Sequence, residues 1–293
     1  MSVANRSVGR DVHVYDAKNP DTALGGLILT NGVTNANFYS MVEIFCIFDS
    51  SFFLRDEGGR TIQRDDSPLH PSKYYILTNG SITINNEGYL ARAVSVASGT
   101  RLASFRDAVR ERDKGCVVTG KVAVNAYKNN WVGFQAAHVF PLAYEQQWKD
   151  GNYSRWITIP AADGGTINSV QNGILLRSDI HARFDTYDFS IDPDDGYKII
   201  CFNLDGEGIA GKHLDQRFLG DPNRPVDQLL RWHFRQAVFA NMRGAGEPIF
   251  ECDFPPGSDM MGEIMSSPGA AGRMEFELFS RLAASNKENV IHS

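Results

Sequence analysis

Apolar residues alternate with polar ones in some parts of this chain and recur every three to four positions in others. Strand-like alternation covers residues 12–15 and 26–29, and helical spacing covers residues 37–48. Residues 74–77 and 82–84 have strand composition and are separated by the turn residues 78–81, which predicts a hairpin. The first part of the chain is therefore expected to be a small α+β region.

The rest of the chain also mixes both periodicities. A helix is predicted over residues 100–113, because Leu102, Phe105 and Val109 share one face and Lys114-Gly115 follows. Further expected elements are a strand over 131–138, a loop over 152–168, a short helix over 180–184, a strand over 197–202, a long helix over 226–243 and a last helix over 273–284. We expect an α+β chain with an accessory region at 1–98, a core at 99–195, a packed strand and helices at 196–284 and a flexible tail at 285–293.

Composition narrows the class of protein. The 293 residues are 42% hydrophobic and 22% charged, as in ordinary folded proteins. The four cysteines lie far apart, which predicts buried thiols and disfavours a zinc knuckle or a disulfide framework. Neither a signal-peptide core nor a membrane-length apolar run is present in the sequence, so we expect an intracellular protein, cytoplasmic or nuclear, without a membrane segment.

The charge balance disfavours bulk coating of nucleic acid but leaves room for a local contact. The net charge is -6 and the pI is about 5.7. The span 101–128 nevertheless holds seven basic residues and three acidic ones. This span predicts a locally basic surface, although a solvated helix face would have the same composition.

Four residues carry the strongest chemical signal. His138 follows an apolar strand and suits a general base, since imidazole titrates near neutral pH. Asn172 precedes an apolar run and could bridge backbone groups with its amide, or simply form an Asn-Gly turn. His181 and Asp185 are four residues apart, so on a helix they could hold one cation between them.

The segments AAHVFP, NGILLRSDIHARFD and FSID resemble the HNH endonuclease family, and in particular the HNH domains of many fungal proteins. The resemblance covers about residues 116–191. It implies a ββα-metal finger, with His138 as the general base, Asn172 as its support and His181 as a metal ligand. Asp185 lies where some members place a further ligand. Many members have an aspartate or histidine directly before the base, where this chain has Ala137.

The resemblance implies a DNA endonuclease that uses one divalent metal, Mg²⁺ or Mn²⁺ first and Zn²⁺ or Ni²⁺ as alternatives. Two further residues are weighed near the finger: Asp179, for which helix capping is favoured over metal ligation, and Gln135, for which a solvent-facing position is favoured. The candidate contacts to nucleic acid are Arg106, Arg110, Lys114, Arg177 and Arg183. The alternatives are an impaired module that only binds DNA or protein, and a nuclease acting on RNA. A homodimer is a further expectation.

Two other patterns are weaker. The glycine-rich residues 206–213 fit the dinucleotide fingerprint and, except at the last residue, the phosphate-binding P-loop. His213 stands where the P-loop needs Ser or Thr, and no long apolar helix follows, so a glycine-rich turn is favoured. His233 lies on the apolar face of a predicted helix, where a hydrogen-bonded core histidine is favoured over a ligand.

Overall fold

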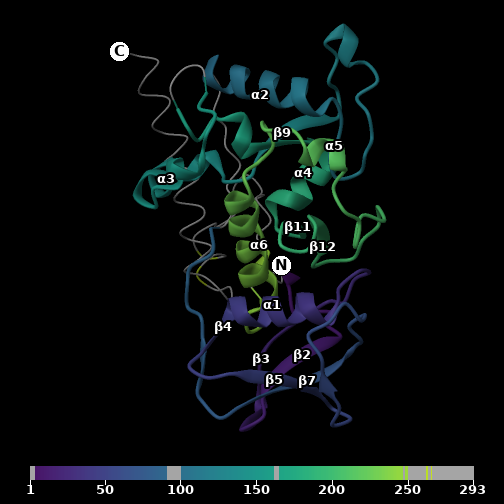
Figure 1. The fold of residues 1–293 in the computed structure, drawn as a ribbon, viewed down its shortest axis with the longest axis vertical. Coiled ribbons are helices and arrows are strands. Elements are labelled where there is room, and N and C mark those ends of the chain that lie inside the picture. The colour runs from purple at the N-terminus through teal and green to yellow at the C-terminus, as the bar shows by residue number, and fades with distance from the viewer. Residues whose placement is uncertain are drawn as a thin grey trace.

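The computed structural model describes residues 4–90, 100–161 and 165–246, together with 248–249, 262 and 265 (Figure 1). Within these residues the helices and strands are mixed along the chain, which confirms the α+β class. The predicted helix at 273–284, the tail at 285–293 and Cys252 lie outside the described residues. The predicted domain boundaries and the homodimer stay predictions.

The N-terminal part is a five-stranded sheet with one helix on it. The strands are β2 (Val12–Asp16), β3 (Asn19–Leu27), β5 (Phe52–Asp56), β6 (Thr61–Ile62) and β7 (Ser72–Thr78), in the order β3-β2-β7-β5-β6. Only the β2–β7 pair is parallel. Helix α1 (Asn35–Phe45) begins at a capping box made by Thr34 and Asn37. Its apolar side, including Phe38 and Phe45, is buried in one cluster with the inward residues of the sheet.

Two further strand pairs form separate two-stranded sheets. Strand β4 (Cys46–Phe48) pairs with β8 (Ile82–Ile84), and β1 (Ala4–Asn5) pairs with β13 (Pro248–Ile249). The hairpin predicted from residues 74–77 and 82–84 is therefore wrong, because β7 lies between β2 and β5 while β8 pairs with β4. The helix predicted to Phe48 ends at Phe45, where the extended Cys46 begins β4. The strand predicted at 26–29 begins earlier and ends at Leu27.

The second part of the chain is built around a pair of antiparallel strands between two helices. Strand β9 (Phe134–His138) pairs with β10 (Gly173–Arg177), with α2 (Thr100–Asp113) on one face and α4 (Ser178–Asp185) on the other. Strands β11 (Phe189–Asp192) and β12 (Lys198–Cys201) form a second pair. The shorter helices are η1 (Ala126–Lys128), η2 (Leu142–Tyr144), α3 (Glu145–Asp150), η3 (Tyr153–Trp156), η4 (Val170–Asn172) and α5 (Gln216–Leu219). Prediction of α2 was correct at both ends, and Lys114, with φ of 54°, follows its last residue.

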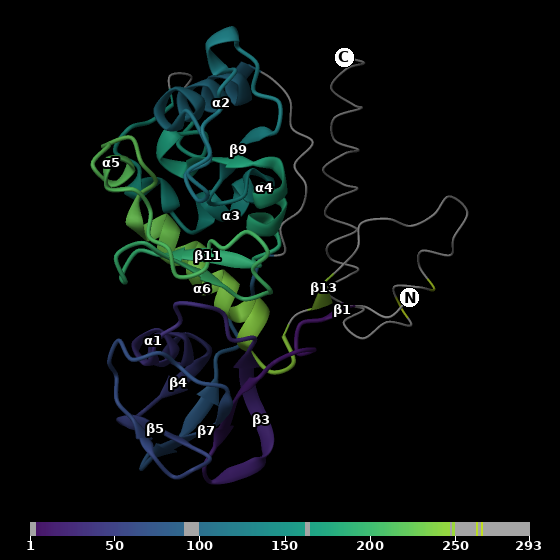
Figure 2. The ribbon, with the colours of Figure 1, turned by 90° about the vertical axis from the view of Figure 1, so that its right-hand side faces the viewer.

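Helix α6 (Asp227–Met242) connects the two parts. Its first half places Leu229, Leu230 and Trp232 in the apolar cluster around β9–β10 and α4. Its second half, from Phe234 to Met242, is buried in the cluster of the N-terminal sheet. Figures 1 and 2 show this helix running from one part into the other. Helix α6 therefore packs on both parts of the chain.

Several smaller expectations can be checked. Cys46, Cys116 and Cys201 are buried free thiols. His233 is a buried core histidine that hydrogen-bonds to Ser190 Oγ at 2.7 Å through Nδ1, stacks on Phe184 and has Nε2 3.3 Å from the Phe184 carbonyl oxygen. Residues 206–213 form bends and turns followed only by the four-residue helix α5, which fits the favoured turn. None of the described helices is long and apolar enough to span a membrane.

Candidate active site

The β9–β10 pair presents the candidate residues on two different faces. The register places His138 opposite Gly173, Ala137 opposite Ile174 and Gln135 opposite Leu176. Because side chains alternate along a strand, Gln135 and Ala137 share one face and Ala136 and His138 the other. Ala137 packs in the cluster that contains residues of α4, whereas Ala136 packs in the cluster that contains residues of α2.

His138 lies at the end of β9 and faces α2. Its ring stacks on Phe105 of that helix, with 3.8 Å between ring centroids and 10° between the planes. Its Nε2 atom is 3.1 Å from Oδ1 of the buried Asn168. An amide oxygen only accepts, so Nε2 donates the proton and Nδ1 is the basic nitrogen of the neutral imidazole. Both the plane and the tautomer of this histidine are thereby fixed.

Gly173 makes the stacking of His138 on Phe105 possible. A Cβ atom at Gly173 would lie 2.5 Å from Phe105 Cε2 and 2.6 Å from Val109 Cγ2, both of which are buried. Only glycine at this position lets α2 approach the strand pair so closely. The Asn-Gly dipeptide of the sequence therefore has a packing reason beyond a turn.

Asn172 is fully buried and bridges the chain that follows His138. Its Oδ1 accepts the Phe140 N–H at 2.7 Å, and its Nδ2 donates to the carbonyl oxygens of Phe140 at 3.1 Å and Ile167 at 2.8 Å. Its own carbonyl accepts the Val139 N–H at 2.9 Å. The backbone bridge proposed from the sequence is present, while the role of Asn172 in catalysis stays a prediction.

His181 and Asp185 lie together on α4, as their spacing predicts. His181 Nε2 is 3.2 Å from Asp185 Oδ2. On the other side of the ring, His181 Nδ1 is 2.7 Å from Oε1 of Gln135. Gln135 is exposed, as the sequence suggested, but it also fixes the His181 ring from the neighbouring strand.

The hydrogen bond to Gln135 has an electrostatic consequence. Because Gln135 Oε1 accepts, Nδ1 of His181 carries a proton, and the lone pair of a neutral ring is then on Nε2. That lone pair and the Asp185 carboxylate repel each other at 3.2 Å unless a cation lies between them. A metal ion held by both atoms would remove this repulsion.

Position 137 adds no ligand to this pair. Ala137 is fully buried in the cluster that includes Ile180 and Phe184 of α4. Among the described residues there is no group of three or more His, Cys, Asp or Glu side chains placed to hold a metal ion. The candidate metal donors that the structure brings together are therefore His181 and Asp185.

The other weighed residues have partners of their own. Asp179 lies in the first turn of α4 but does not cap it: the N-cap is Arg177, without a side-chain cap bond, and Asp179 pairs with that arginine. Arg177 also binds Glu207 at 2.8 Å, and its hydrogen bonds with Glu207 and then Asp179 raise its pKa. Arg183 donates to the Leu204 carbonyl at 3.0 Å. These contacts leave Arg177 less suited to binding phosphate than its sequence position suggests.

The basic candidates on α2 differ in exposure. Arg106 is exposed and paired with Asp107 at 2.9 Å, and Lys114 lies 3.5 Å from Glu111. Arg110 lies over the Trp131 ring, 5.0 Å from its centroid, and burial lowers its pKa. All three lie on or directly after the helix that covers His138.

Sequence reasoning missed a buried charge pair that holds α2 in place. Arg112 and Asp113 have side chains only 3% and 0% exposed and pair directly. Arg112 also donates to the carbonyls of Val170, Asn223 and Gly173, and Asp113 accepts the Leu175 N–H at 2.7 Å. The pair thus ties the end of α2 to β10 beside Asn172. Arg112 was one of the seven basic residues from which a locally basic surface was predicted over 101–128, and for this residue the prediction was wrong.

Phe105 and Asn168 were also missed as partners of His138. The polar residues Asn168, Ser169, Gln171 and Asn172 are all buried, although they lie in and just after a segment predicted as loop. A run of polar residues directly before an apolar strand was the available signal. Buried polar groups need hydrogen-bond partners, which makes such a run a candidate for internal bridging.

Two family models match parts of this chain. Residues 116–192 match the family model described as HNH endonuclease, which spans β9, β10, α4 and β11. The chain therefore contains an HNH endonuclease domain. Residues 9–83 match a domain of unknown function, DUF8573, which covers most of the N-terminal part. Searches of curated proteins and of solved structures gave no significant match.

Proposed function

We propose that this chain is a divalent-metal-dependent DNA endonuclease whose metal is held by His181 and Asp185 and whose general base is His138. The proposal rests on one observation: His181 Nε2 lies 3.2 Å from Asp185 Oδ2, and His181 Nδ1 is hydrogen-bonded to Gln135. This is the arrangement of a metal-binding histidine whose second nitrogen donates to an oxygen. We propose that β9, β10 and α4 together form a ββα-metal finger.

The donor atoms have a spacing that fits one ion. Two ligands at about 2.0–2.2 Å from a metal, in tetrahedral or neighbouring octahedral positions, are separated by about 2.8–3.6 Å. The 3.2 Å between His181 Nε2 and Asp185 Oδ2 lies in this range. With one nitrogen and one carboxylate oxygen, Mn²⁺, Zn²⁺ and Ni²⁺ suit the site as well as Mg²⁺. Two protein ligands give weak binding, so we expect occupancy to depend on the metal concentration and on substrate.

His138 would take the proton of the attacking water at Nδ1, because its Nε2 is engaged with Asn168. Phe105 holds the ring plane, and Asn172 holds the backbone just after the histidine. A bound divalent ion would stabilise the negative charge of the scissile phosphate and its leaving oxygen. His181 and Asp185 would hold that ion, and Gln135 would keep the His181 ring oriented.

The two halves of this site lie on opposite faces of the β9–β10 pair. Within the described residues the only strand paired with β9 is β10, so the other edge of β9 takes part in no strand pairing. We propose that the scissile phosphate binds at this edge, where it could contact both His138 and a metal ion held by His181 and Asp185. The proposal therefore requires the backbone of the nucleic acid to pass along the outer edge of β9.

Nicking of supercoiled plasmid tests the proposal. Purified protein is incubated with Mg²⁺, Mn²⁺, Ni²⁺ or Zn²⁺, and the His138→Ala and His181→Ala variants are compared with His70→Ala, which changes an exposed histidine in the N-terminal part. We expect about 10²-fold or greater loss for the first two, as for removal of a general base, and no loss for the third. If His138→Ala nicked the plasmid at the wild-type rate, His138 would not be the general base.

Single-stranded DNA and RNA are tested in the same reactions. Faster cutting of RNA than of DNA would replace the DNA assignment with the RNA-directed alternative. No cutting of any substrate with any metal, while DNA is still bound, would replace the enzyme with a binding module.

A further inference from the structure

We propose that residues 121–132 form an arm that holds an unpaired nucleotide of the substrate, with Tyr127 stacked on the base and Lys121 and Lys128 beside the phosphates. The inference rests on the proposed function, because it names how the same domain would hold its nucleic acid. The arm projects beyond the end of α2 at the top right of Figure 1 and leads directly into β9.

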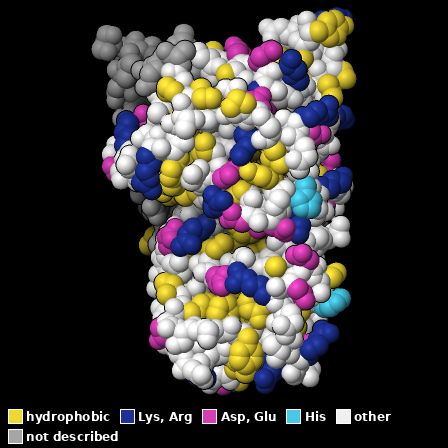
Figure 3. Space-filling model, in the orientation of Figure 1, with side chains coloured by type: hydrophobic (Ala, Val, Ile, Leu, Met, Phe, Trp, Pro, Cys, Tyr) yellow, Lys and Arg dark blue, Asp and Glu magenta, His cyan; other side chains and the backbone are white. Residues whose placement is uncertain are grey.

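The arm exposes an unusual amount of apolar surface. Val122, Val124, Tyr127 and Val132 are 62%, 72%, 78% and 87% exposed, and they make up four of the nine large hydrophobic residues that are exposed in the described part of the chain. Figure 3 shows hydrophobic and basic side chains next to one another at this corner of the molecule. Apolar side chains gathered in this way, with charges around them, are typical of a contact surface.

The charge of the arm selects an anionic partner. No Asp or Glu occurs in the 31 residues from Lys114 to Tyr144, although the chain as a whole has 35 acidic residues in 293. The exposed charges of the arm are Lys121 and Lys128, and the Lys128 Nζ lies 5.2 Å from the centre of the Tyr127 ring. An exposed aromatic ring beside lysines is the combination that binds single strands, since the ring stacks on a base while the lysines contact phosphates.

The arm is also held in one conformation before any partner binds. Its base is fixed by the Ala123 N–H donating to Lys114 O and by Cys116 N–H donating to Lys121 O. Its tip is closed by the Lys128 and Asn130 N–H groups, which both donate to Asn125 O. Gly120 and Gly133, with φ of 72° and 81°, lie at its two ends. A preorganised contact loses less conformational freedom on binding than a flexible one.

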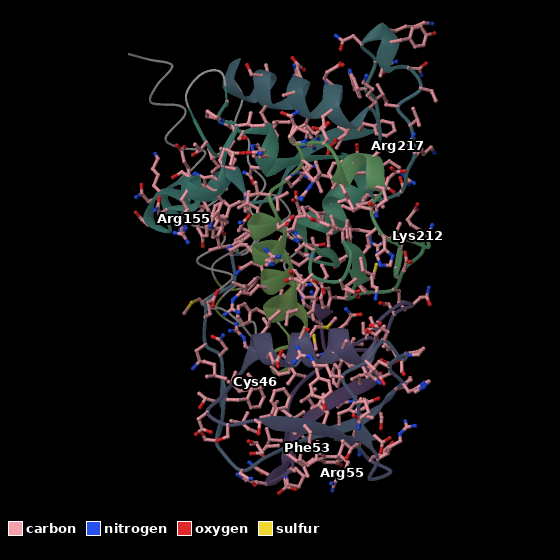
Figure 4. All side chains as sticks on the ribbon, in the orientation of Figure 1. Cys46, Phe53, Arg55, Arg155, Lys212 and Arg217 are labelled. Carbon is pink, nitrogen blue, oxygen red and sulfur yellow. The ribbon has the colours of Figure 1, made fainter. Side chains whose placement is uncertain are left out.

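Binding of a fluorescein-labelled oligothymidine, followed by anisotropy in EDTA, tests the stacking. Tyr127→Ser should weaken binding by about 5- to 150-fold, the range for one stacked base, whereas Tyr127→Phe should stay within about twofold. The matched control is Phe53→Ser, since Phe53 is also an exposed aromatic residue near a cation, Arg55, but lies at the opposite end of the molecule (Figure 4). Equal affinity of Tyr127→Ser and Phe53→Ser would overturn the proposal.

Salt dependence tests the lysines. Lys121→Gln/Lys128→Gln should reduce the slope of log K against log salt by about 1.4, because each phosphate contact on a single strand contributes about 0.7. Lys73→Gln/Lys212→Gln removes the same charge from exposed positions elsewhere and should leave the slope unchanged. An equal change in both double variants would show a net-charge effect and contradict the arm. An equal loss of blunt-duplex binding in Tyr127→Ser would replace the unpaired nucleotide with a groove contact and likewise overturn it.

Failure of the arm and failure of the nuclease give different results. Cleavage of the small diester bis(4-nitrophenyl) phosphate needs the active site but not the arm, so Tyr127→Ser should cleave it at the wild-type rate. Wild-type cleavage combined with unchanged oligonucleotide binding by Tyr127→Ser rejects the arm alone. Weakened binding by Tyr127→Ser in a protein that cleaves nothing supports the arm as a nucleic-acid contact and rejects the nuclease.

Discussion

Replacing Arg112 by Met should strongly destabilise the protein. The substitution keeps an unbranched side chain but leaves the fully buried Asp113 carboxylate without its cation, and it removes the Arg112 hydrogen bonds to the carbonyls of Val170, Gly173 and Asn223. Burial already raises the pKa of Asp113, so its charged form depends on this partner. Breaking a buried pair costs about 3–5 kcal/mol, a large part of a typical unfolding free energy of about 5–15 kcal/mol.

The same helix supplies a matched control. Arg106 and Asp107 repeat the Arg-Asp sequence of residues 112–113, but their side chains are 47% and 61% exposed. An exposed pair contributes about 0–1 kcal/mol, so Arg106→Met should leave the unfolding free energy nearly unchanged. Urea denaturation followed by tryptophan fluorescence measures both variants. A fall of the midpoint for Arg112→Met alone, at unchanged slope, is the expected result.

Adding Asp113→Asn to Arg112→Met should recover part of the loss, because the buried unpaired charge is removed while the Leu175 N–H keeps an acceptor. Equal midpoints for the Arg112→Met and Arg106→Met variants would refute the assignment of Arg112 as a buried clamp. A double variant less stable than Arg112→Met would refute the electrostatic origin of the loss.

Three further substitutions test the packing, the buried hydrogen bonds and the buried carboxyl group of this part of the chain. Gly173→Ala should cost about 1–3 kcal/mol of unfolding free energy and slow nicking, because its Cβ would collide with Phe105; unchanged thermal unfolding would contradict this. Asn172→Ala should cost about 2–4 kcal/mol, measured by urea denaturation, since it leaves buried groups of Phe140 and Ile167 unpaired. Burial raises the pKa of Asp192 to about 6, from 3.8. The folded state therefore binds this proton more tightly than the unfolded state, and stability present below pH 4 is lost as pH rises through 6, by about 2–3 kcal/mol. Asp192→Asn should remove the loss of stability between about pH 4 and 6, and an unchanged pH profile of stability would contradict the burial of this carboxyl group.

Local sequence patterns were sufficient to predict helix α2 and the contact between two candidate residues on α4. Leu102, Phe105 and Val109 predicted α2 at its observed ends, and the four-residue spacing of His181 and Asp185 predicted their contact. Both conclusions depend only on helical periodicity, which a single segment contains.

Long-range partners could not be read in the same way. Strand composition at 82–84 was correct, but its pairing with β4 rather than β7 depends on how α1 returns the chain to the sheet. The burial of Arg112 depends on contacts with residues around positions 170 and 223, and nothing in the local sequence distinguishes it from Arg106. The stacking of Phe105 on His138 likewise joins segments 33 residues apart, so it depends on tertiary packing.

Comparing single and double variants of His138 and His181 tests the central claim most directly. The rate of Mn²⁺-dependent plasmid nicking is measured for the wild type, His138→Ala, His181→Ala and the double variant. If both residues act on one phosphate, the double variant should be about as slow as the slower single variant, because residues that act as a unit are not additive. Wild-type nicking by either single variant, or losses that multiply in the double variant, would contradict a single site at the edge of β9.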